Sequence, residues 1–285
     1  HRRRHHRSRQ APTPSLDPLK CTSYACHNRV SLVYSRLVKP AKGERLYDTR
    51  IVSDLAESWT TSANGLEWSF NLRRGVRWAS LPPVNGRELT SDDVVYSFGL
   101  YAQEVDSPWR YRYEGVSEIK ALDKYLIQFT LKAPDPQFLL LLASEPSWIV
   151  PREVTTPDVV AIGTGPFIIA RHHPEVGSFY DKNPNYFLAE QVLLDGIDMH
   201  VIPDKGVAIA VFRTGGLDIL GYPGQHDLAK SEMDSLAKNS PGVQFNKAFR
   251  NLVWSLGVKY ECRCPLYKLA VRKAINHSID RDALI

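Results

Sequence analysis

The 285 residues, 43% hydrophobic and 24% charged, have the composition of a soluble globular protein that can bury a sizeable core in two lobes. No apolar run approaches the roughly 20 residues needed to cross a bilayer, which excludes a membrane-spanning helix. Five arginines in the first ten residues account for the formal charge of +5, and the remaining 31 basic residues balance 31 acidic ones, so no nucleic-acid partner is expected.

Residues 1–15 are predicted to form a basic, disordered tail, because the first ten carry like charges that repel and nothing apolar to bury. An arm that binds anions is the functional alternative. The tail also lacks the hydrophobic stretch of a signal peptide, so we expect any export signal to lie upstream or to have been removed.

The next elements are predicted by hydrophobic periodicity. Alternating apolar residues indicate strands over 66–72, after an Asn64-Gly65 hairpin turn, and over 125–131. A helix is expected after Thr90, a good N-cap, with Asp93 near the positive end of the helix dipole. A short apolar helix is predicted at 138–143.

The second half of the chain alternates strands with a helix. Strands are predicted over 167–169, 197–201 and 217–220, and a helix over 207–212 ends at Gly215-Gly216. This order predicts the α/β class. The segment 265–285 is expected to be an amphipathic helix with four side chains turned inward: Leu269, Val271, Ala274 and Ile275.

The stretch AIGTGPF, residues 161–167, has the glycine spacing of a nucleotide loop but lacks a third glycine and a following Lys-Ser/Thr. We therefore interpret it as a sharp turn, in which the glycines tolerate positive φ and Pro166 fixes its own φ. The chain would then enter the strand that begins at Phe167.

Neither the cysteines nor the histidines form a recognisable site. Cys21 and Cys26 are five residues apart, Cys262 and Cys264 only two, and neither spacing is typical of zinc, so the redox state of the four thiols stays open. The nine histidines show no metal-binding spacing, and no G-x-S-x-G elbow is present. No enzyme activity, metal or cofactor is expected.

Five segments in order resemble the extracytoplasmic solute-binding proteins of family 5, the peptide, nickel and oligopeptide receptors of ABC importers. They are SDLAESW (53–59), LEWSFNLRRGVRW (66–78), GRELTSDDVVYSF (86–98), IGTGPF (162–167) and VRKAINHSIDRDALI (271–285). The resemblance covers residues 16–285 and implies a two-lobe, periplasmic-binding-protein-like fold of type II with an inserted α+β domain.

The resemblance also implies a domain organisation. Residues 16–50 and 161–245 would form the first lobe, 51–160 the inserted domain, and 246–285 the start of a second lobe that is largely missing. IGTGPF would lie where the chain returns from the inserted domain. The basic start and the segment KYECRCPLYKL depart from the family pattern.

Ligand contacts are expected in three segments. Two resemble cleft-lining parts of the family, and the third is an aromatic-rich loop, SPWRYRY, whose tryptophan would stack on a ligand. A satisfied surface turn or packing in the core is the structural alternative. The residues are Thr22, Ser23 and Tyr24; Glu145, Ser147 and Trp148; and Trp109.

The resemblance implies a non-enzymatic, monomeric receptor at the cell surface or in the periplasm. It would capture a peptide or a similar small polar solute between its lobes and deliver it to ABC permease subunits in the membrane. The alternative is a truncated or degenerate copy that acts as a sensor or interaction module without transport. A hydrolase or transferase is a third reading, but the sequence offers no catalytic constellation for it.

Overall fold

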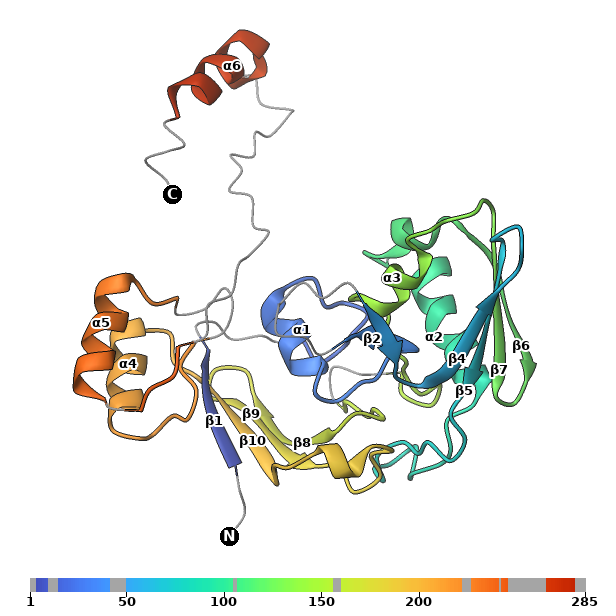
Figure 1. Cartoon of the computed structure of the whole chain (residues 1–285), viewed down its shortest axis with the longest axis horizontal. Helices are drawn as coiled ribbons and strands as arrows, with labels where there is room; N and C mark the ends of the chain where they lie inside the picture. Colours follow the sequence, from blue (N-terminus) through green and yellow to red (C-terminus); the bar gives the residue numbers. More distant parts are fainter. Residues whose placement is uncertain are drawn as a thin grey trace. The chain divides into compact units, whose positions relative to one another are not determined.

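The structure, a computed structural model, describes residues 4–9, 15–41, 50–104, 107–155, 160–221, 227–240, 242–245 and 265–279. The chain divides into two compact units, His1–Ala248 and Phe249–Ile285. The first unit contains the described sheets and five of the described α-helices, and the second contributes one α-helix (Figure 1).

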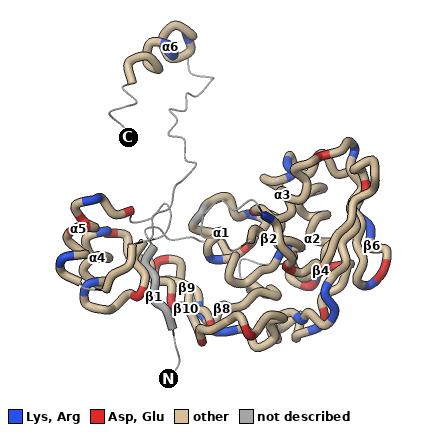
Figure 2. The backbone as a smooth tube through the Cα atoms, viewed as in Figure 1, with Lys and Arg blue, Asp and Glu red and all other residues tan. Residues whose placement is uncertain are grey.

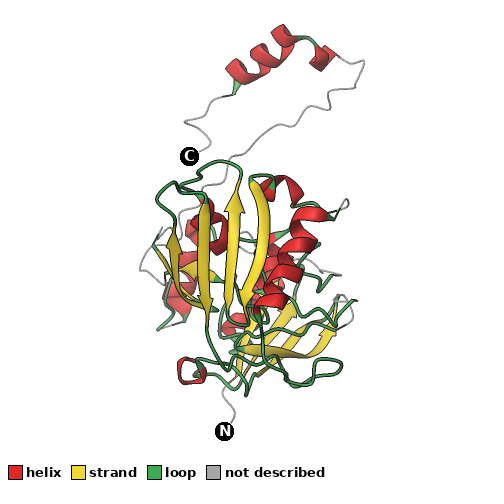
Figure 3. Cartoon of the chain, turned by 90° about the vertical axis from the view of Figure 1, so that its right-hand side faces the viewer, coloured by secondary structure: helices red, strands yellow, loops and turns green. Residues whose placement is uncertain are grey.

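The larger apolar core is built on an antiparallel sheet with the strand order β4-β5-β7-β6 (Figure 3). Alternate residues of a strand face opposite sides of the sheet. Phe70 and Phe129 lie on the face that packs into the core, and both are fully buried. Helix α2 covers that face, with its Phe98 ring centroid 5.0 Å from that of Phe129. The predicted strands are confirmed as β5 and β7. The bounds are β4 (Ala56–Thr61), β5 (Glu67–Leu72), β6 (Val116–Asp123), β7 (Leu126–Leu131) and α2 (Ser91–Gln103).

Helix α2 begins where the sequence predicts, but Thr90 caps it through its backbone. The Thr90 N–H donates to Asp93 Oδ2 at 3.0 Å, and the Asp93 N–H donates to the Thr90 carbonyl at 3.1 Å, while the Thr90 hydroxyl has no hydrogen-bond partner. Asp93 is fully buried and also accepts two bonds from Arg87, at 2.8 and 2.6 Å. Arg87 pairs in turn with Glu153. A partly exposed arginine therefore links the buried Asp93 carboxylate to Glu153 and fixes the start of α2.

A second sheet, with the order β1-β10-β9-β8, carries the other core cluster. Its β1 (Arg4–Arg9) lies within the segment predicted to be a disordered tail, and that prediction is wrong for these six residues. They pair in parallel with β10 at the edge of the sheet, through backbone groups that need no apolar side chain. The other strands are β8 (Phe167–His173), β9 (Gly177–Lys182) and β10 (Gly196–Val201). β8 and β10 confirm the strands expected at 167–169 and 197–201, whereas β9 was not predicted.

The stretch AIGTGPF crosses against residues 32–34 and does not form a left-handed turn. Neither Gly163 nor Gly165 has positive φ. Instead, a Cβ on Gly163 would lie 1.9 Å from the Val33 carbonyl oxygen, and one on Gly165 would lie 2.6 Å from it. Gly165 N–H donates to that oxygen at 2.8 Å. The glycines are therefore required for close backbone approach, and the positive-φ explanation is corrected.

The remaining elements are short. They are α1 (Tyr24–Val30), β2 (Val38–Pro40), β3 (Ile51–Ser53), η1 (Arg110–Tyr113), α3 (Phe138–Ala143), η2 (Ala189–Gln191), α4 (Lys205–Arg213), α5 (Lys230–Asn239), η3 (Pro265–Tyr267) and α6 (Leu269–Ser278). α3 and α4 confirm predicted helices, and Gly215, at φ 78°, follows the end of α4.

Two expectations for the C-terminal half are wrong. Residues 217–220 contain a single bridge position and no strand, because alternation alone does not make a strand where no neighbour pairs along the whole segment. The helix expected within 265–285 is confirmed as α6 over Leu269–Ser278, but α6 has no buried residue, and the Leu269 side chain that was expected to face inward is 58% exposed. Its apolar face has no covering element among the described residues of its unit.

Candidate functional site

The loop 143–148 starts at the last residue of α3 and is held by side chains of neighbouring segments. Four of its carbonyl oxygens accept bonds from arginine or tyrosine side chains, so its backbone is fixed without belonging to a sheet. The donors and acceptors are Arg36 Nη1 to Ala143 (2.7 Å), Arg112 Nη1 to Glu145 (2.5 Å), the Tyr113 hydroxyl to Pro146 (2.6 Å) and the Tyr101 hydroxyl to Trp148 (3.3 Å).

Two predicted contact residues of this loop point into the core. Ser147 is fully buried, lies 2.9 Å from the Tyr113 hydroxyl and donates to the Leu141 carbonyl at 2.9 Å. Trp148 is 2% exposed, and the Arg36 guanidinium lies 4.3 Å from the centre of its ring. Both side chains support the loop and do not face solvent in this structure, so neither forms part of an exposed surface here, and their contact with a ligand stays a prediction.

Glu145, by contrast, projects from the fixed loop with 35% of its side chain exposed. Its Oε2 lies 3.2 Å from Nδ1 of His27 on α1, although the two atoms are not aligned for a hydrogen bond. Trp109 lies beside the same histidine, with its ring centroid 6.0 Å from that of His27. The structure thus brings together two predicted residues, Trp109 and Glu145, around a histidine that the sequence analysis did not single out.

The electrostatics of this cluster follow from burial. Burial, and then the charge of Arg36, lower the pKa of His27 from 6.5 to about 4, so the imidazole is neutral at neutral pH. Burial raises the pKa of Glu145, and the Arg36 charge opposes that rise. Because His27 has the depressed pKa, its contribution to stability is present at neutral pH and is lost as the pH falls from 6.5 towards 4.

The segment before α1 carries the other predicted contacts. Thr22 and Ser23 are exposed, and the Ser23 hydroxyl accepts from the Cys26 N–H at 3.4 Å as the N-cap of α1. Tyr24 is the first residue of α1, and its side chain lies outside the described part of the chain. A disulfide joins Cys21 to Cys26 and closes this loop. It resolves the redox state of one cysteine pair; Cys262 and Cys264 lie outside the described residues.

Sequence reasoning missed His27, Arg36 and Arg112. His27 lies one helical turn after the predicted Tyr24, so the helix period could have drawn attention to it. The two arginines act through the carbonyl oxygens of residues more than 30 positions away. A local sequence pattern cannot predict contacts between residues so far apart in the chain.

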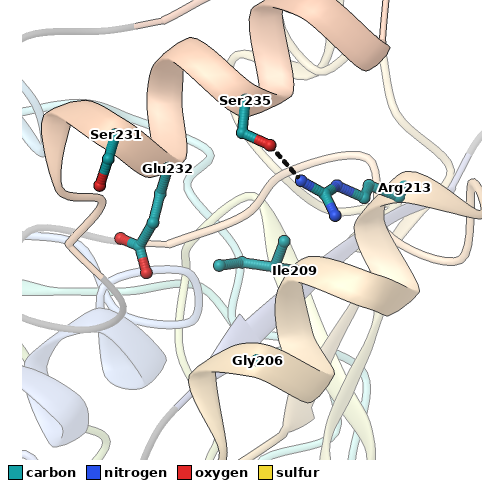
Figure 4. Close-up of a pocket in the computed structure, with 6 residues that line it drawn as sticks. All are labelled: Gly206, Ile209, Arg213, Ser231, Glu232 and Ser235. Atoms are coloured by element: carbon teal, nitrogen blue, oxygen red, sulfur yellow. Dashed lines mark hydrogen bonds between the residues drawn. The ribbon is translucent and has the colours of Figure 1, made fainter.

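A hollow lies between α4 and α5 and has a volume of about 310 Å³ (Figure 4). Its charged groups are already engaged, since Arg213 donates to the Ser235 hydroxyl at 2.8 Å and Glu232 pairs with Lys205 at 2.6 Å. Six residues line it: Gly206, Ile209, Arg213, Ser231, Glu232 and Ser235. It offers few free polar groups for a ligand.

The charge distribution and the positions of possible metal ligands were compared with what other kinds of site require. Basic and acidic residues are interspersed along the described chain (Figure 2). Among the described residues, no three histidine, cysteine or acidic side chains gather in a way that would hold a metal ion. Nor does any helix of the described part combine the length and hydropathy needed to cross a membrane.

Comparison with known proteins gives a consistent result. The model of a family described as "Bacterial extracellular solute-binding proteins, family 5 Middle" matches residues 50–285. The dipeptide-binding protein of Escherichia coli (strain K12) is 28% identical, covering 95% of this chain and 53% of that protein. Heme-binding protein A of Haemophilus influenzae is 28% identical, covering 89% and 48%.

A solved structure shows the same likeness. It is the ABC transporter-associated periplasmic binding protein DppA from Helicobacter pylori in complex with peptide STSA, which is 26% identical with a TM-score of 0.72. The match covers 83% of this chain and 49% of that one. The chain therefore spans about half the length of the relatives it matches.

Proposed function

The chain belongs to the bacterial extracellular solute-binding proteins of family 5, and from this membership we propose that it captures a peptide or similar small polar solute for an ABC importer. The periplasmic-binding-protein-like α/β fold expected from the sequence is confirmed by the likeness to solved binding proteins. The matched relatives are named for binding dipeptides or haem, which supports a non-enzymatic role. ABC permease subunits are the proposed partners, and the periplasm or cell surface the proposed location.

One observation carries the proposal to these residues. His27 belongs to the segment proposed as the first lobe, whereas Trp109 and Glu145 belong to the proposed inserted domain, and the three meet at one place. A solute receptor needs polar and aromatic side chains that converge from different segments. Thr22 and Ser23, exposed beside α1, would extend the surface. Closure of two lobes on the solute would then present a changed shape to the permease.

The test is a thermal-shift measurement on the full chain with a pool of di- to pentapeptides, and with nickel and haem in separate arms. A ligand that binds only the folded state stabilises it and so raises the melting temperature. The added stability is about 2.7 kcal/mol at a ligand concentration of 100 times the Kd. We expect a shift with the peptide pool, its loss in Trp109→Ala, and its retention in Tyr111→Ala, which removes a 65% exposed ring from the same segment.

Each outcome discriminates. A shift with haem or nickel but not with the peptide pool would mean that the proposed solute is wrong and that haem or nickel is bound instead. A folded protein that responds to none of the three would contradict the proposed function, and an equal loss in both ring variants would contradict the proposed location.

A further inference from the structure

Arg36 extends from a backbone that is fixed beside the candidate site. Its N–H donates to Asp54 Oδ2 at 3.0 Å. The carbonyl of the preceding residue, Ser35, accepts from the Ile149 N–H at 3.0 Å, which brings this segment against the end of the loop 143–148. The Arg36 side chain therefore starts from a defined position next to the loop.

The Arg36 side chain contacts both ends of that loop. Its Nη1 donates to the Ala143 carbonyl at 2.7 Å, and its guanidinium lies 4.3 Å from the centre of the Trp148 ring. A guanidinium can make both contacts at once, because its flat face stacks on a ring while its N–H groups donate in the plane. Glu145 lies between these two anchored ends, so the path of the loop around Glu145 depends on Arg36.

The other side-chain supports of the loop come from a different part of the chain. Arg112, Tyr113 and Tyr101 hold the other three fixed carbonyl oxygens, and all three residues belong to the proposed inserted domain. Arg36 and His27 belong to the segment proposed as the first lobe. Of these four supports, Arg36 is therefore the one that fixes the loop relative to His27.

The charge of Arg36 acts on the same two side chains of the site. After burial, it is the second cause that lowers the pKa of His27 to about 4, and it opposes the rise that burial causes in the pKa of Glu145. Arg36 thus favours a neutral imidazole beside an ionised carboxylate. Its contacts and its charge both act on the arrangement of His27 and Glu145.

We infer that Arg36 is a positioning residue of the proposed solute site, which locks the loop 143–148 to the first-lobe segment and so sets how Glu145 and His27 lie relative to each other. The inference rests on the proposed function and places Arg36 behind the residues that would contact the solute. Its loss should weaken solute capture through the loop, beyond any loss of stability.

Two measurements separate positioning from stability. Amide hydrogen exchange at Ile149, whose N–H bonds to Ser35, reports on the attachment of the loop and needs no solute. A thermal-shift measurement with the di- to pentapeptide pool reports on capture, as the rise above the ligand-free melting temperature of each protein. A change that only destabilises the fold lowers the ligand-free value and leaves the stabilisation by the pool intact.

The proteins are the full wild-type chain, Arg36→Met, Arg36→Lys and the control Lys39→Met. Lys39 follows in the same segment and pairs with Asp54 at 3.1 Å, but among the described residues no hydrogen bond or ion pair joins its side chain to the loop. Arg36→Lys keeps the positive charge and loses the flat stacking surface. Circular dichroism checks that each variant folds.

We expect Arg36→Met to speed exchange at Ile149 about tenfold and to weaken peptide capture about tenfold, as for the loss of a hydrogen bond from a charged donor. At a pool concentration of 100 times the wild-type Kd, a tenfold weaker affinity about halves the stabilisation by the pool. Arg36→Lys should recover only part of both effects. Lys39→Met should match the wild type in exchange and in the response to the pool.

The remaining outcomes contradict the inference in distinguishable ways. An unchanged exchange rate in Arg36→Met would overturn it whatever the peptides do. Faster exchange with an undiminished response to the pool would overturn it and leave the receptor function standing, as would equal losses in Lys39→Met or full recovery in Arg36→Lys. A folded wild type that does not respond to the pool would contradict the proposed function and, with it, the placement of Arg36 behind a solute site.

Discussion

Replacing Gly163 with alanine should destabilise the protein severely, although it adds a single methyl group. The new Cβ would lie 1.9 Å from the Val33 carbonyl oxygen and 2.6 Å from its carbon, whereas ordinary contacts begin near 3.4 Å. The two backbone segments must therefore separate by about 1.5 Å, the difference between those distances. Both are main chain, so no side chain can rotate away.

The cost can be estimated from the bonds at the crossing. Separation strains the bond from Gly165 N–H to Val33 O at 2.8 Å and the bond from Ala79 N–H to Gly163 O at 3.0 Å. Each such bond contributes about 1 kcal/mol, and overpacking adds about 1–3 kcal/mol. We expect a total loss of about 3–5 kcal/mol, a large share of the 5–15 kcal/mol typical of folded domains.

Urea unfolding followed by tryptophan fluorescence and circular dichroism measures the effect. A loss of this size should lower the urea midpoint by about 1–2 M. Gly99→Ala is the matched control, because Gly99 lies within α2 and a Cβ there meets nothing within 4 Å. It should be neutral or stabilising by up to about 1 kcal/mol. If Gly163→Ala and Gly99→Ala unfold at the same midpoint, the close-approach argument is refuted.

Three further changes test the start of α2 and two residues of the candidate site region. Arg87→Met should cost about 3–5 kcal/mol because it strands the fully buried Asp93 carboxylate, whereas Arg152→Met, at an exposed ion pair, should stay within about 1 kcal/mol of wild type in the same urea assay. Lowering the pH from 7 to 4.5 should destabilise the wild type by about 1–3 kcal/mol more than His27→Gln, since the unfolded imidazole binds protons first; parallel losses in the two proteins would exclude His27 as the cause. Ser147→Ala should lower stability by about 0.5–1.5 kcal/mol, because it removes buried hydrogen bonds while the Tyr113 hydroxyl and the Leu141 carbonyl keep their other partners; an unchanged midpoint would mean that the Ser147 hydrogen bonds contribute nothing.

The parts of the fold that could be predicted from the sequence are those specified locally. The strand at 67–72 follows from side-chain alternation, and the start of α2 follows from Thr90 and Asp93 three residues apart. Even there the sequence pattern missed part of the arrangement: Arg87, six residues before Asp93, holds the Asp93 carboxylate, and Thr90 caps the helix through its backbone. The edge strand Arg4–Arg9 was missed because its composition gives no apolar signal.

The candidate site was only partly predictable for a related reason. The resemblance drew attention to the segment 145–148, but residue type alone cannot say which of its side chains face outward. Ser147 turns inward because the Tyr113 hydroxyl and Leu141 carbonyl lie there, and Glu145 turns outward on a backbone held by Arg112. Each of these contacts joins residues whose proximity the fold creates and no short motif encodes.

The way the loop 143–148 is held separates its shape from its chemistry. Its path is dictated by donors that reach the carbonyl oxygens from outside, so replacing the Glu145 side chain changes the charge offered to a solute while leaving the backbone supports in place. Side chains on such a frame can be changed one residue at a time, without redesigning the scaffold. Under the proposed function, position 145 is the first to randomise in order to change which solute is captured.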